Sequence, residues 1–236
     1  MSSASPALSR GRPRLSFSGG GDPHRSPFLY WLGWTLSRWS IGLYFGRTEA
    51  GSEHVPASGP VILASNHASF MDPPFVGSSC GRPISYLARE SLFSNPVFGW
   101  VLRKVGAVPV DRDGASGKGV KTILDRLKGG DGIILFPEGT RTSDGQLGAS
   151  RAGVGLVVLK SGAPVVPVRV FGTYEAYGRH VKIPRSRRVS IRFGPPLMFS
   201  DLRAEAATAS RARIKEMYQE VSDQILRAIA SLEGPE

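Results

Sequence analysis

A histidine and an aspartate, His67 and Asp72, flank a small apolar turn in the stretch SNHASFMDPPF, residues 65–75. If the carboxylate bonds one ring nitrogen, it fixes the histidine tautomer and raises the basicity of the other nitrogen. A general base placed in this way is worth ~10²–10⁴-fold in rate. The alternative is a plain helix start, with Asp72 as the N-cap before Pro73 and Pro74 and His67 as an ordinary polar residue. The spacing alone favours the helix start.

Metal binding is not expected around this histidine. Zinc sites need several His or Cys ligands at regular spacing, and the other histidines, His24, His54 and His180, are scattered along the chain. The single cysteine, Cys80, leaves no cysteine cluster and no disulfide framework. The sequence therefore predicts no metal and a reducing compartment.

Two further stretches place charged side chains directly after apolar runs. In LFPEGTRTSDG, residues 135–145, Gly139 lets the backbone approach a ligand closely, and Arg141 offers a forked donor for phosphate or carboxylate. In VGAVPVDRD, residues 105–113, the apolar run ends at Arg112. Each stretch has an ordinary alternative, a polar loop for the first and a weak surface ion pair for the second.

A fourth stretch, APVVPVRV at residues 163–170, has Pro164 and Pro167 inside an apolar run. Proline removes a hydrogen bond from a sheet ladder and is confined to edge strands or bulges. We therefore expect an edge strand or a bulged wall. A wall for an alkyl chain is one use, and a plain edge strand is the commoner one.

From residue 60 onward, short β-branched runs alternate with amphipathic stretches. The candidate strands are residues 61–65, 84–88, 107–111, 132–136, 164–171 and 189–193. The candidate helices are about residues 72–79, 94–103, 117–128, 150–161 and 203–232. This alternation predicts a layered α/β fold with a mostly parallel or mixed central sheet flanked by helices. A strand ending at Ser65 would deliver His67 to the end of the sheet, where open α/β folds bind ligands.

The stretch FLYWLGWTLSRWSIGLYFG, residues 28–46, holds three of the four tryptophans. Crossing a bilayer takes roughly 20 apolar residues, and a central arginine, here Arg38, costs ~2.5–3.5 kcal/mol there. Large apolar residues share one helical face, away from Thr35 and Arg38. They are Leu29, Leu32, Leu36, Trp39 and Leu43. We expect a helix that lies in the membrane interface, and a helix packed in the core of its own domain is the alternative.

The chain is strongly basic, with a formal net charge of +11 and a pI of about 10.3. This excess points to a polyanionic partner, which could be nucleic acid, an anionic membrane or a phosphorylated or CoA-bearing substrate. The stretch GRHVKIPRSRRVSIR, residues 178–192, is rich in Lys and Arg and contains no acid. Near anionic lipid, each such charge contributes ~1 kcal/mol of attraction.

The 236 residues fit one compact domain with an appendage. Residues 1–27 are rich in Ser, Pro, Gly and Arg and lack the apolar run of a secretory signal, so we expect a disordered basic arm; an organelle transit peptide is the alternative. Residues 28–50 form the predicted membrane-interface helical segment, and residues 51–236 the predicted catalytic domain.

Taken together, four of these stretches resemble the motif blocks of one family. NHASFMD resembles the N-H-x4-D block of the glycerolipid acyltransferases, the 1-acyl-glycerol-3-phosphate acyltransferases and their relatives. GAVPVDR resembles the second block, FPEGTR the third and APVVPV the fourth, and they follow in the family's order. The resemblance covers roughly residues 28–200. The second block departs from the pattern, because Val108, Pro109 and Val110 stand where an aromatic residue and an isoleucine are common.

The resemblance implies an acyltransferase that moves an acyl group from acyl-CoA or acyl carrier protein to the free hydroxyl of 1-acyl-glycerol-3-phosphate, giving phosphatidic acid. It implies that His67 is the general base and that Asp72 supports it. Residues of the second and third blocks would hold the acceptor's phosphate. They are Arg112, Glu138, Gly139, Thr140 and Arg141. Pro167 belongs to the fourth block, as an acyl-chain wall or a structural residue.

The resemblance also implies no cofactor apart from the acyl donor, and an enzyme bound peripherally or monotopically to the cytoplasmic face of the cell membrane. An anionic membrane surface is then an expected partner and nucleic acid is not. Another lysophospholipid or a related alcohol is the alternative acceptor. A basic protein that binds membrane or nucleic acid without catalysis is the alternative of another class. The stretch GSSCG, residues 77–81, matches G-x-S-x-G around Ser79 but lacks the preceding strand of a hydrolase nucleophile elbow.

Overall fold

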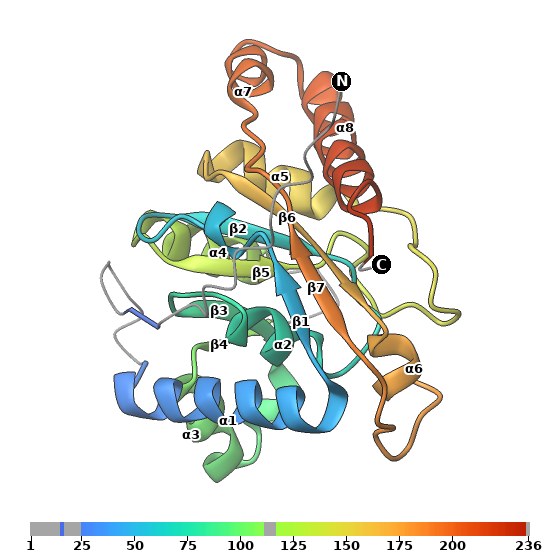
Figure 1. Cartoon of the computed structure of the whole chain (residues 1–236). Coiled ribbons are helices and arrows are strands. Elements are labelled where there is room, and N and C mark those ends of the chain that lie inside the picture. Colours follow the sequence, from blue (N-terminus) through green and yellow to red (C-terminus); the bar gives the residue numbers. More distant parts are fainter. Residues whose placement is uncertain (1–14, 17–24, 111–116, 235–236) are drawn as a thin grey trace.

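The computed structural model describes residues 15–16, 25–110 and 117–234, without the side chain of Lys118. Its centre is a seven-stranded sheet in the order β1-β7-β6-β2-β5-β3-β4, with helices on both faces (Figure 1). The strands are β1 (Thr48–Ala50), β2 (Val61–Ser65), β3 (Ile84–Arg89), β4 (Ala107–Val110), β5 (Gly132–Leu135), β6 (Val165–Phe171) and β7 (Ser190–Phe193). The helices are α1 (Pro27–Phe45), α2 (Asp72–Ser78), α3 (Pro96–Lys104), α4 (Lys118–Lys128), α5 (Ala152–Ser161), α6 (Thr173–Tyr177), α7 (Ser200–Ala206) and α8 (Arg211–Ala230), with short 3-10 turns η1 (Ser52–His54) and η2 (Glu90–Phe93). The layered α/β architecture confirms the expected fold class.

Parallel pairing dominates the sheet. β2 pairs in parallel with both β5 and β6, and β3 pairs in parallel with β5 and β4. β7 runs antiparallel to β6, and β1 runs parallel to β7. The sheet is therefore mixed, and the carboxyl ends of β2, β5 and β6 meet at one edge. The three loops that leave these ends are neighbours there, although they are far apart in the sequence.

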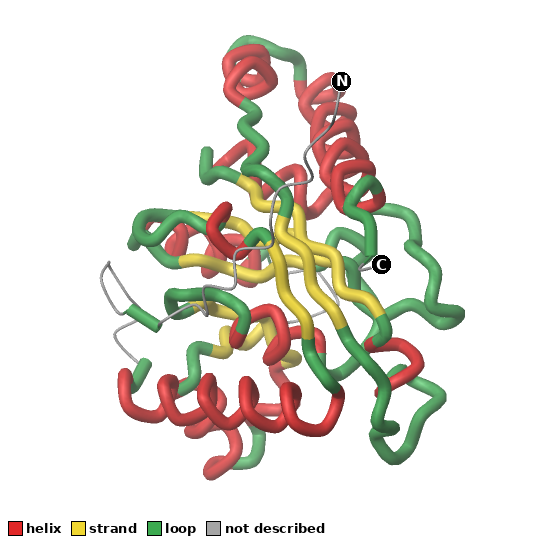
Figure 2. The backbone as a smooth tube through the Cα atoms, viewed as in Figure 1, coloured by secondary structure: helices red, strands yellow, loops and turns green. Residues whose placement is uncertain are grey.

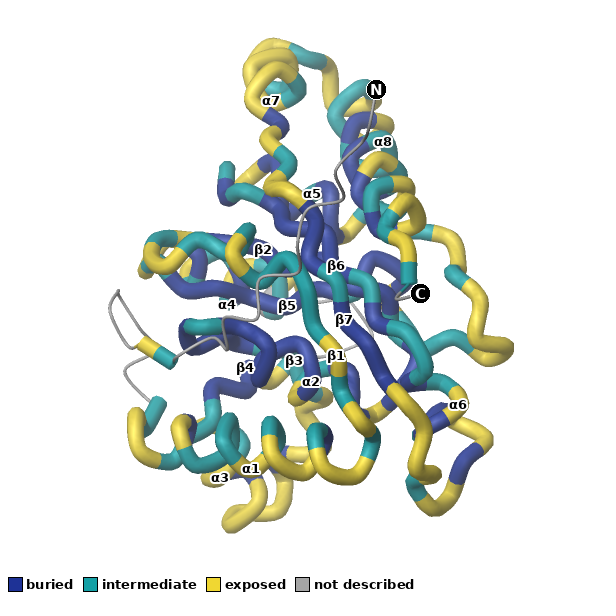
Figure 3. Tube along the Cα trace, in the orientation of Figure 1, coloured by how far each residue is buried: buried dark blue, intermediate teal, exposed yellow. Residues whose placement is uncertain are grey.

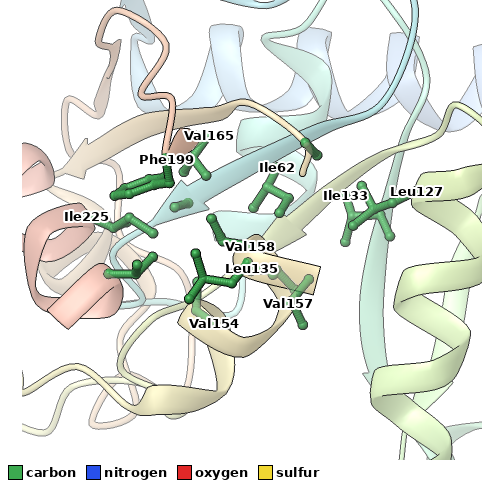
Figure 4. Packing of buried hydrophobic residues seen from close by; sticks show 14 of the residues in the cluster. Ile62, Leu127, Ile133, Leu135, Val154, Val157, Val158, Val165, Phe199 and Ile225 are labelled. Carbon is green, nitrogen blue, oxygen red and sulfur yellow. The ribbon is translucent and has the colours of Figure 1, made fainter. Parts of the chain in front are cut away.

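The central strands bury side chains on both faces, which explains their continuous apolar runs. On one face, residues such as Ile62 and Val165 pack against α4, α5 and α8 (Figure 4). On the other face, residues such as Leu63 and Val166 pack against α1 and α2. Burial of each such side chain is worth ~1.5–3 kcal/mol. The outer surfaces of the helices remain exposed (Figure 3).

Two helical expectations differ from the structure. The predicted helix over residues 203–232 is wrong, because α7 and α8 are separate helices. The hydroxyl of Ser210 accepts a hydrogen bond from the backbone N–H of Arg213, so Ser210 is a true N-cap that starts α8 anew. The short helix α6, which follows β6 directly, was absent from the predicted elements.

The proline-containing segment is not an edge strand. β6 lies between β7 and β2, and Pro167 is paired with Ala64 of β2. On the β7 side, Val168 pairs with Phe193 whereas Val165 pairs with Leu197, so the register shifts by one residue between them. Pro167 lies at this shift, which is where an interior strand can lack a ladder N–H. The edge prediction is wrong, and the bulged alternative agrees with the register.

Most of the expected N-terminal arm, residues 1–14 and 17–24, lies outside the described residues. Arg25, in the same predicted segment, is bound to the domain. Its guanidinium donates to the hydroxyl of Ser85 at 2.6 Å and forms a buried ion pair with Asp131 at 3.3 Å. These contacts fix the chain just before α1 begins.

Helix α1 turns part of its apolar surface outward. Leu36 is 60% exposed, Trp39 63% and Leu43 79%. Its inward face is mixed: Ile41 is buried in the core, and Arg38 donates to Glu49 at 2.5 Å. A core helix buries its apolar stripe, whereas α1 leaves much of its own exposed. Among the described residues, no helix is both long and apolar enough to span a membrane.

The segment expected to be helical over residues 28–50 also contains a strand. α1 ends at Phe45, and Gly46 follows with φ 61°, the left-handed conformation that commonly terminates helices. Thr48–Ala50 then forms β1 at one edge of the sheet (Figure 2). Helix α1 and the sheet are therefore joined by a two-residue connection.

Candidate active site

His67 and Asp72 are in contact at the carboxyl edge of the sheet. Nδ1 of His67 is 2.9 Å from Oδ2 of Asp72. Because a carboxylate only accepts hydrogen bonds, Nδ1 carries the proton and Nε2 is left as a proton acceptor. The Asp72 side chain is fully buried, whereas the His67 side chain keeps 11% of its surface accessible. The pair can therefore remove a proton from a hydroxyl group brought to Nε2.

The Asp72 carboxylate holds the histidine loop as well as the ring. Its Oδ2 also accepts the backbone N–H groups of Ala68 and Ser69, each at 2.7 Å. Asp72 is the first residue of α2, and no side chain caps this helix. The N-cap prediction for Asp72 is wrong, because Pro73 and Pro74 have no N–H to be capped and the N–H of Phe75 donates to the backbone oxygen of Met71 at 2.9 Å. The carboxylate turns back to the preceding loop instead.

Two residues next to the motif fix the position of the imidazole. The ring of Phe136, which directly follows β5, stacks on the His67 ring with centroids 3.9 Å apart. The side-chain amide of Asn66 bonds the backbone of Val170 twice, donating to its oxygen at 3.1 Å and accepting from its nitrogen at 2.8 Å. The side-chain amide of Asn66 thus extends the hydrogen bonding between β2 and β6 beyond the last backbone pair. Phe136 opens the FPEGTR block, but no role in the site had been predicted for it.

The loop after β5 binds the backbone of His67 on both sides. An oxygen of Glu138 accepts the N–H of His67 at 3.0 Å, and the N–H of Thr142 donates to the oxygen of His67 at 2.8 Å. The second oxygen of Glu138 accepts the N–H of Gly148, also at 3.0 Å. Both oxygens of this buried carboxylate are therefore engaged with backbone amides. In this structure Glu138 positions the backbone of His67, and its predicted part in phosphate binding stays a prediction.

Three arginines surround the turn at residues 139–141. The Arg141 guanidinium lies over the Phe70 ring, 3.4 Å from its centroid. Arg179 donates a hydrogen bond to the hydroxyl of Thr140. Gly139 has φ 68°, and a Cβ built there would be 2.8 Å from the Arg151 side chain. The glycine is thus required both by its conformation and by the neighbouring arginine.

A cavity of about 430 Å³ opens beside this turn. It is lined by Glu138, Thr140, Arg141 and much of the segment that runs on to Arg151 at the start of α5. Its position next to the loop that holds His67 makes it a candidate binding space.

Two predicted site residues remain, Arg112 and Pro167. Arg112 falls in the gap of the described residues that follows Val110. Pro167 is buried within β6, and a Cβ built on Gly194 would be 2.9 Å from its ring. It shares a strand face with Val165, which packs on the α5 and α8 side of the sheet. Its role as an acyl-chain wall stays a prediction.

The far end of α2 is held by charged residues from α1 and β1. Arg47 donates to the hydroxyl of Ser79 and to Glu49, both at 2.6 Å, and Arg38 donates to the backbone oxygen of Ser78 at 2.9 Å. Burial lowers the pKa of Arg47, and the charge of Glu49 opposes that shift. The two cations face the carboxyl end of α2, where the helix dipole favours positive charge. This clamp fixes the helix whose first residue holds His67.

The G-x-S-x-G stretch has no catalytic geometry. The Ser79 hydroxyl donates to the backbone oxygen of Phe75 at 2.8 Å, at the carboxyl end of α2 and not after a strand. Cys80 is fully buried, and burial raises the pKa of its thiol. Within the described ranges, no three His, Cys, Asp or Glu side chains come together as candidate metal ligands.

Comparison with known proteins adds three findings. The family model described as "Acyltransferase" matches residues 47–171. A 1-acyl-sn-glycerol-3-phosphate acyltransferase of Pseudomonas aeruginosa is 32% identical over 73% of this chain and 71% of its own length. The chloroplast 1-acyl-sn-glycerol-3-phosphate acyltransferase LPAT1 of Arabidopsis thaliana is 32% identical over 64% of this chain and 43% of its own length. The chain thus spans less than half the length of the chloroplast relatives that it matches.

A solved structure shares the fold. The 1-acyl-sn-glycerophosphate acyltransferase PlsC of Thermotoga maritima matches with a TM-score of 0.66 at 22% identity, over 88% of this chain and 80% of that one. At this identity the match bears on the architecture alone, and it agrees with the mixed, helix-flanked sheet described above.

Proposed function

The chain belongs to the acyltransferase family, and from this premise we propose that it transfers an acyl group from an acyl thioester to the free hydroxyl of 1-acyl-glycerol-3-phosphate, giving phosphatidic acid. The observation that carries the proposal is the hydrogen bond between Nδ1 of His67 and the buried Asp72 carboxylate. It supplies an oriented base at the edge of the sheet where α/β folds bind ligands.

The reaction needs one proton transfer and one displacement. Nε2 of His67 takes the proton of the acceptor hydroxyl while that oxygen attacks the thioester carbonyl. The tetrahedral intermediate then collapses, the carbon–sulfur bond breaks, and the departing sulfur takes the proton from the imidazolium. An ester and a free thiol are produced, and His67 returns to its starting state. No covalent acyl-enzyme is needed, and the buried Asp72 stabilises the transient imidazolium.

The donor in this proposal is acyl-CoA or acyl carrier protein, because both present the acyl group as a thioester. We assign the acceptor's phosphate to the cavity that Arg141 lines. Guanidinium groups bind phosphate through paired, charge-assisted hydrogen bonds.

We further propose that the enzyme lies on an anionic membrane surface through α1. Its outward apolar face, which includes Trp39, is supported by exposed apolar residues of α3, among them Phe98 and Trp100. The start of α1 meets the end of α3, since the N–H of Ser26 donates to the oxygen of Lys104 at 3.1 Å. Exposed apolar side chains on two helices that meet suit the lipid interface.

The basic stretch adjoins the same surface. The Tyr44 hydroxyl of α1 donates to the oxygen of Pro184 at 2.9 Å, and the Ser186 hydroxyl donates to the oxygen of Tyr44 at 2.8 Å. Ile183, between exposed cations, is 79% exposed. Apolar and cationic groups side by side favour an anionic bilayer over nucleic acid, which offers no apolar phase.

A donor and acceptor panel tests the proposed reaction. The purified protein is incubated with acyl-CoA or acyl carrier protein of several chain lengths and with lysophosphatidic acid, other lysophospholipids or no acceptor, and the lipid products are identified by mass spectrometry. The proposal predicts phosphatidic acid from lysophosphatidic acid. Absence of any acyl transfer across the panel would show that the proposed activity is wrong.

A further inference from the structure

A short segment after α6 contacts both loops of the site. The Ser69 hydroxyl, in the histidine loop, donates to the backbone oxygen of Tyr177 at 2.7 Å. Two residues further on, Arg179 donates to the hydroxyl of Thr140, in the loop that binds the backbone of His67. Residues 177–179 therefore contact both the loop after β2 and the loop after β5, although they belong to none of the four motif blocks. In Figure 1, α6 lies at the end of the sheet where β6 ends and β7 begins.

The backbone holds Arg179 in a fixed turn. The N–H of Gly178 donates to the oxygen of Tyr174 at 2.8 Å, and the N–H of Val181 donates to the oxygen of Gly178 at 3.0 Å. A Cβ built on Gly178 would be 2.5 Å from the oxygen of Tyr174, so only glycine fits. The arginine side chain thus starts from a defined point at the rim of the site, although the residue itself is exposed.

The charge of Arg179 is not neutralised by the nearby acids. Glu138 uses both carboxylate oxygens on backbone amides. Asp144 accepts hydrogen bonds from Thr142 and from the N–H of Gln146. Within the described part of the chain, Arg179 forms no ion pair, and the hydrogen bond to Thr140 uses one of its five donors. The other donors are left for an anionic ligand.

We propose that Arg179 binds the phosphate monoester of the acyl acceptor, together with Arg141, and so makes the site prefer a phosphorylated glycerol over an uncharged one. The inference rests on the proposed function and extends its phosphate site to a residue outside the motif blocks. Arg179 donates to Thr140, the residue directly before Arg141, so both cations are associated with the same turn. The forked donors of arginine match a phosphate oxygen pair.

Steady-state kinetics of Arg179→Gln test this assignment, with Arg211→Gln as the control. Both residues are exposed, so both variants lose one surface charge, and Arg211 lies at the start of α8, outside the basic stretch. Loss of a charge-assisted hydrogen bond predicts that Arg179→Gln raises the KM for lysophosphatidic acid by about tenfold or more. The control leaves that KM near the wild-type value, and kcat and the KM for the acyl donor are unchanged in both variants.

Two outcomes would overturn the assignment. Equal effects of the two variants would mean that Arg179 acts only through the general charge of the surface. If Arg179→Gln raises the KM for acyl-CoA and leaves the KM for the acceptor unchanged, the guanidinium binds a phosphate of the donor. Thermal unfolding of each variant checks that the fold is intact.

Direct binding separates this inference from the proposed reaction. Glycerol 3-phosphate carries the phosphate monoester without an acyl chain, and its binding can be titrated by NMR on the wild type and on Arg179→Gln. If the wild type transfers no acyl group to any lysophospholipid, the proposed function fails, but weaker glycerol 3-phosphate binding by Arg179→Gln would still support the phosphate site. Equal binding by both proteins would refute it.

Discussion

The carboxylate of Glu138 accepts the backbone N–H of His67 across 3.0 Å, which ties the loop after β5 to the loop after β2. Thr142, four residues later in the same loop, donates to the backbone oxygen of His67. The peptide groups on both sides of His67 are therefore held by one loop. This contact explains why an acid is suitable at position 138: its two oxygens accept the N–H groups of His67 and Gly148.

Glu138→Gln tests this positioning role. A glutamine has one acceptor oxygen and one NH₂ group, so one of the two amides, of His67 or Gly148, would face a donor and lose its partner. A buried amide without a partner costs ~1–3 kcal/mol. We expect a lower free energy of unfolding in urea and a lower kcat with a largely unchanged KM for the acceptor. Glu53→Gln, at an exposed position, is the control and should change neither quantity. A raised acceptor KM with wild-type stability would instead assign Glu138 to substrate binding.

Asp72→Asn separates orientation of the base from the start of α2. The amide oxygen can still accept the N–H groups of Ala68 and Ser69, so we expect a folded protein with a modest change in melting temperature. The same oxygen also accepts Nδ1 of His67, but the amide supplies no negative charge to stabilise the imidazolium that forms during proton transfer. Because general base catalysis is worth ~10²–10⁴-fold, kcat should fall by about a hundredfold or more. An unchanged kcat in a folded variant would mean that Asp72 serves only the loop.

Gly139→Ala probes the turn between the base and the arginines. The left-handed conformation costs an alanine ~1–2 kcal/mol, and its Cβ would displace the Arg151 side chain. We expect a decrease of at least that size in the free energy of unfolding. Gly153→Ala is the matched control, because a Cβ there meets nothing within 4 Å, and it should raise stability by up to ~1 kcal/mol. Equal effects of the two substitutions on urea unfolding would contradict this explanation of Gly139.

The outward apolar face of α1 predicts membrane binding that can be removed without unfolding. The double variant Leu36→Gln and Trp39→Gln changes two side chains that are 60% and 63% exposed. Each buried apolar side chain contributes ~1.5–3 kcal/mol, so cosedimentation with phosphatidylglycerol vesicles should fall at least tenfold. Thermal unfolding should not change. Met198→Gln is the control, since this exposed residue precedes Phe199 on the α5 and α8 side of the sheet. Vesicle binding that survives the double variant would exclude α1 as the membrane contact.

Much of the fold was predictable because the central strands are short apolar runs between turn signals. The run VILAS forms β2 over Val61–Ser65 with the predicted bounds, since both of its faces are buried and no polar residue interrupts it. Predictions from short stretches were wrong where contacts between distant parts of the chain determine the structure. Pro167 indicated an edge, yet a register shift accommodates it inside the sheet. The long amphipathic stretch near the C-terminus indicated one helix, and the cap at Ser210 divides it.

The sequence indicated the His67–Asp72 contact but not the other contacts around these residues. The spacing of His67 and Asp72 permits the hydrogen bond that the structure contains, whereas the roles of Phe136 and Arg179 depend on strand order. Phe136 reaches the imidazole because β5 is the neighbour of β2. Arg179 reaches Thr140 because β6 is the neighbour on the other side. Sheet order is a non-local property that no single stretch of sequence encodes.

The most direct test of the central claim is the rate of thiol release from acyl-CoA by the wild type and by His67→Ala, each with and without lysophosphatidic acid. The wild type should release thiol only when the acceptor is present. His67→Ala, verified as folded by circular dichroism, should release it at least ~10²-fold more slowly, because no other group replaces the general base. Acceptor-dependent thiol release by His67→Ala at the wild-type rate would contradict the assignment of His67 as the base.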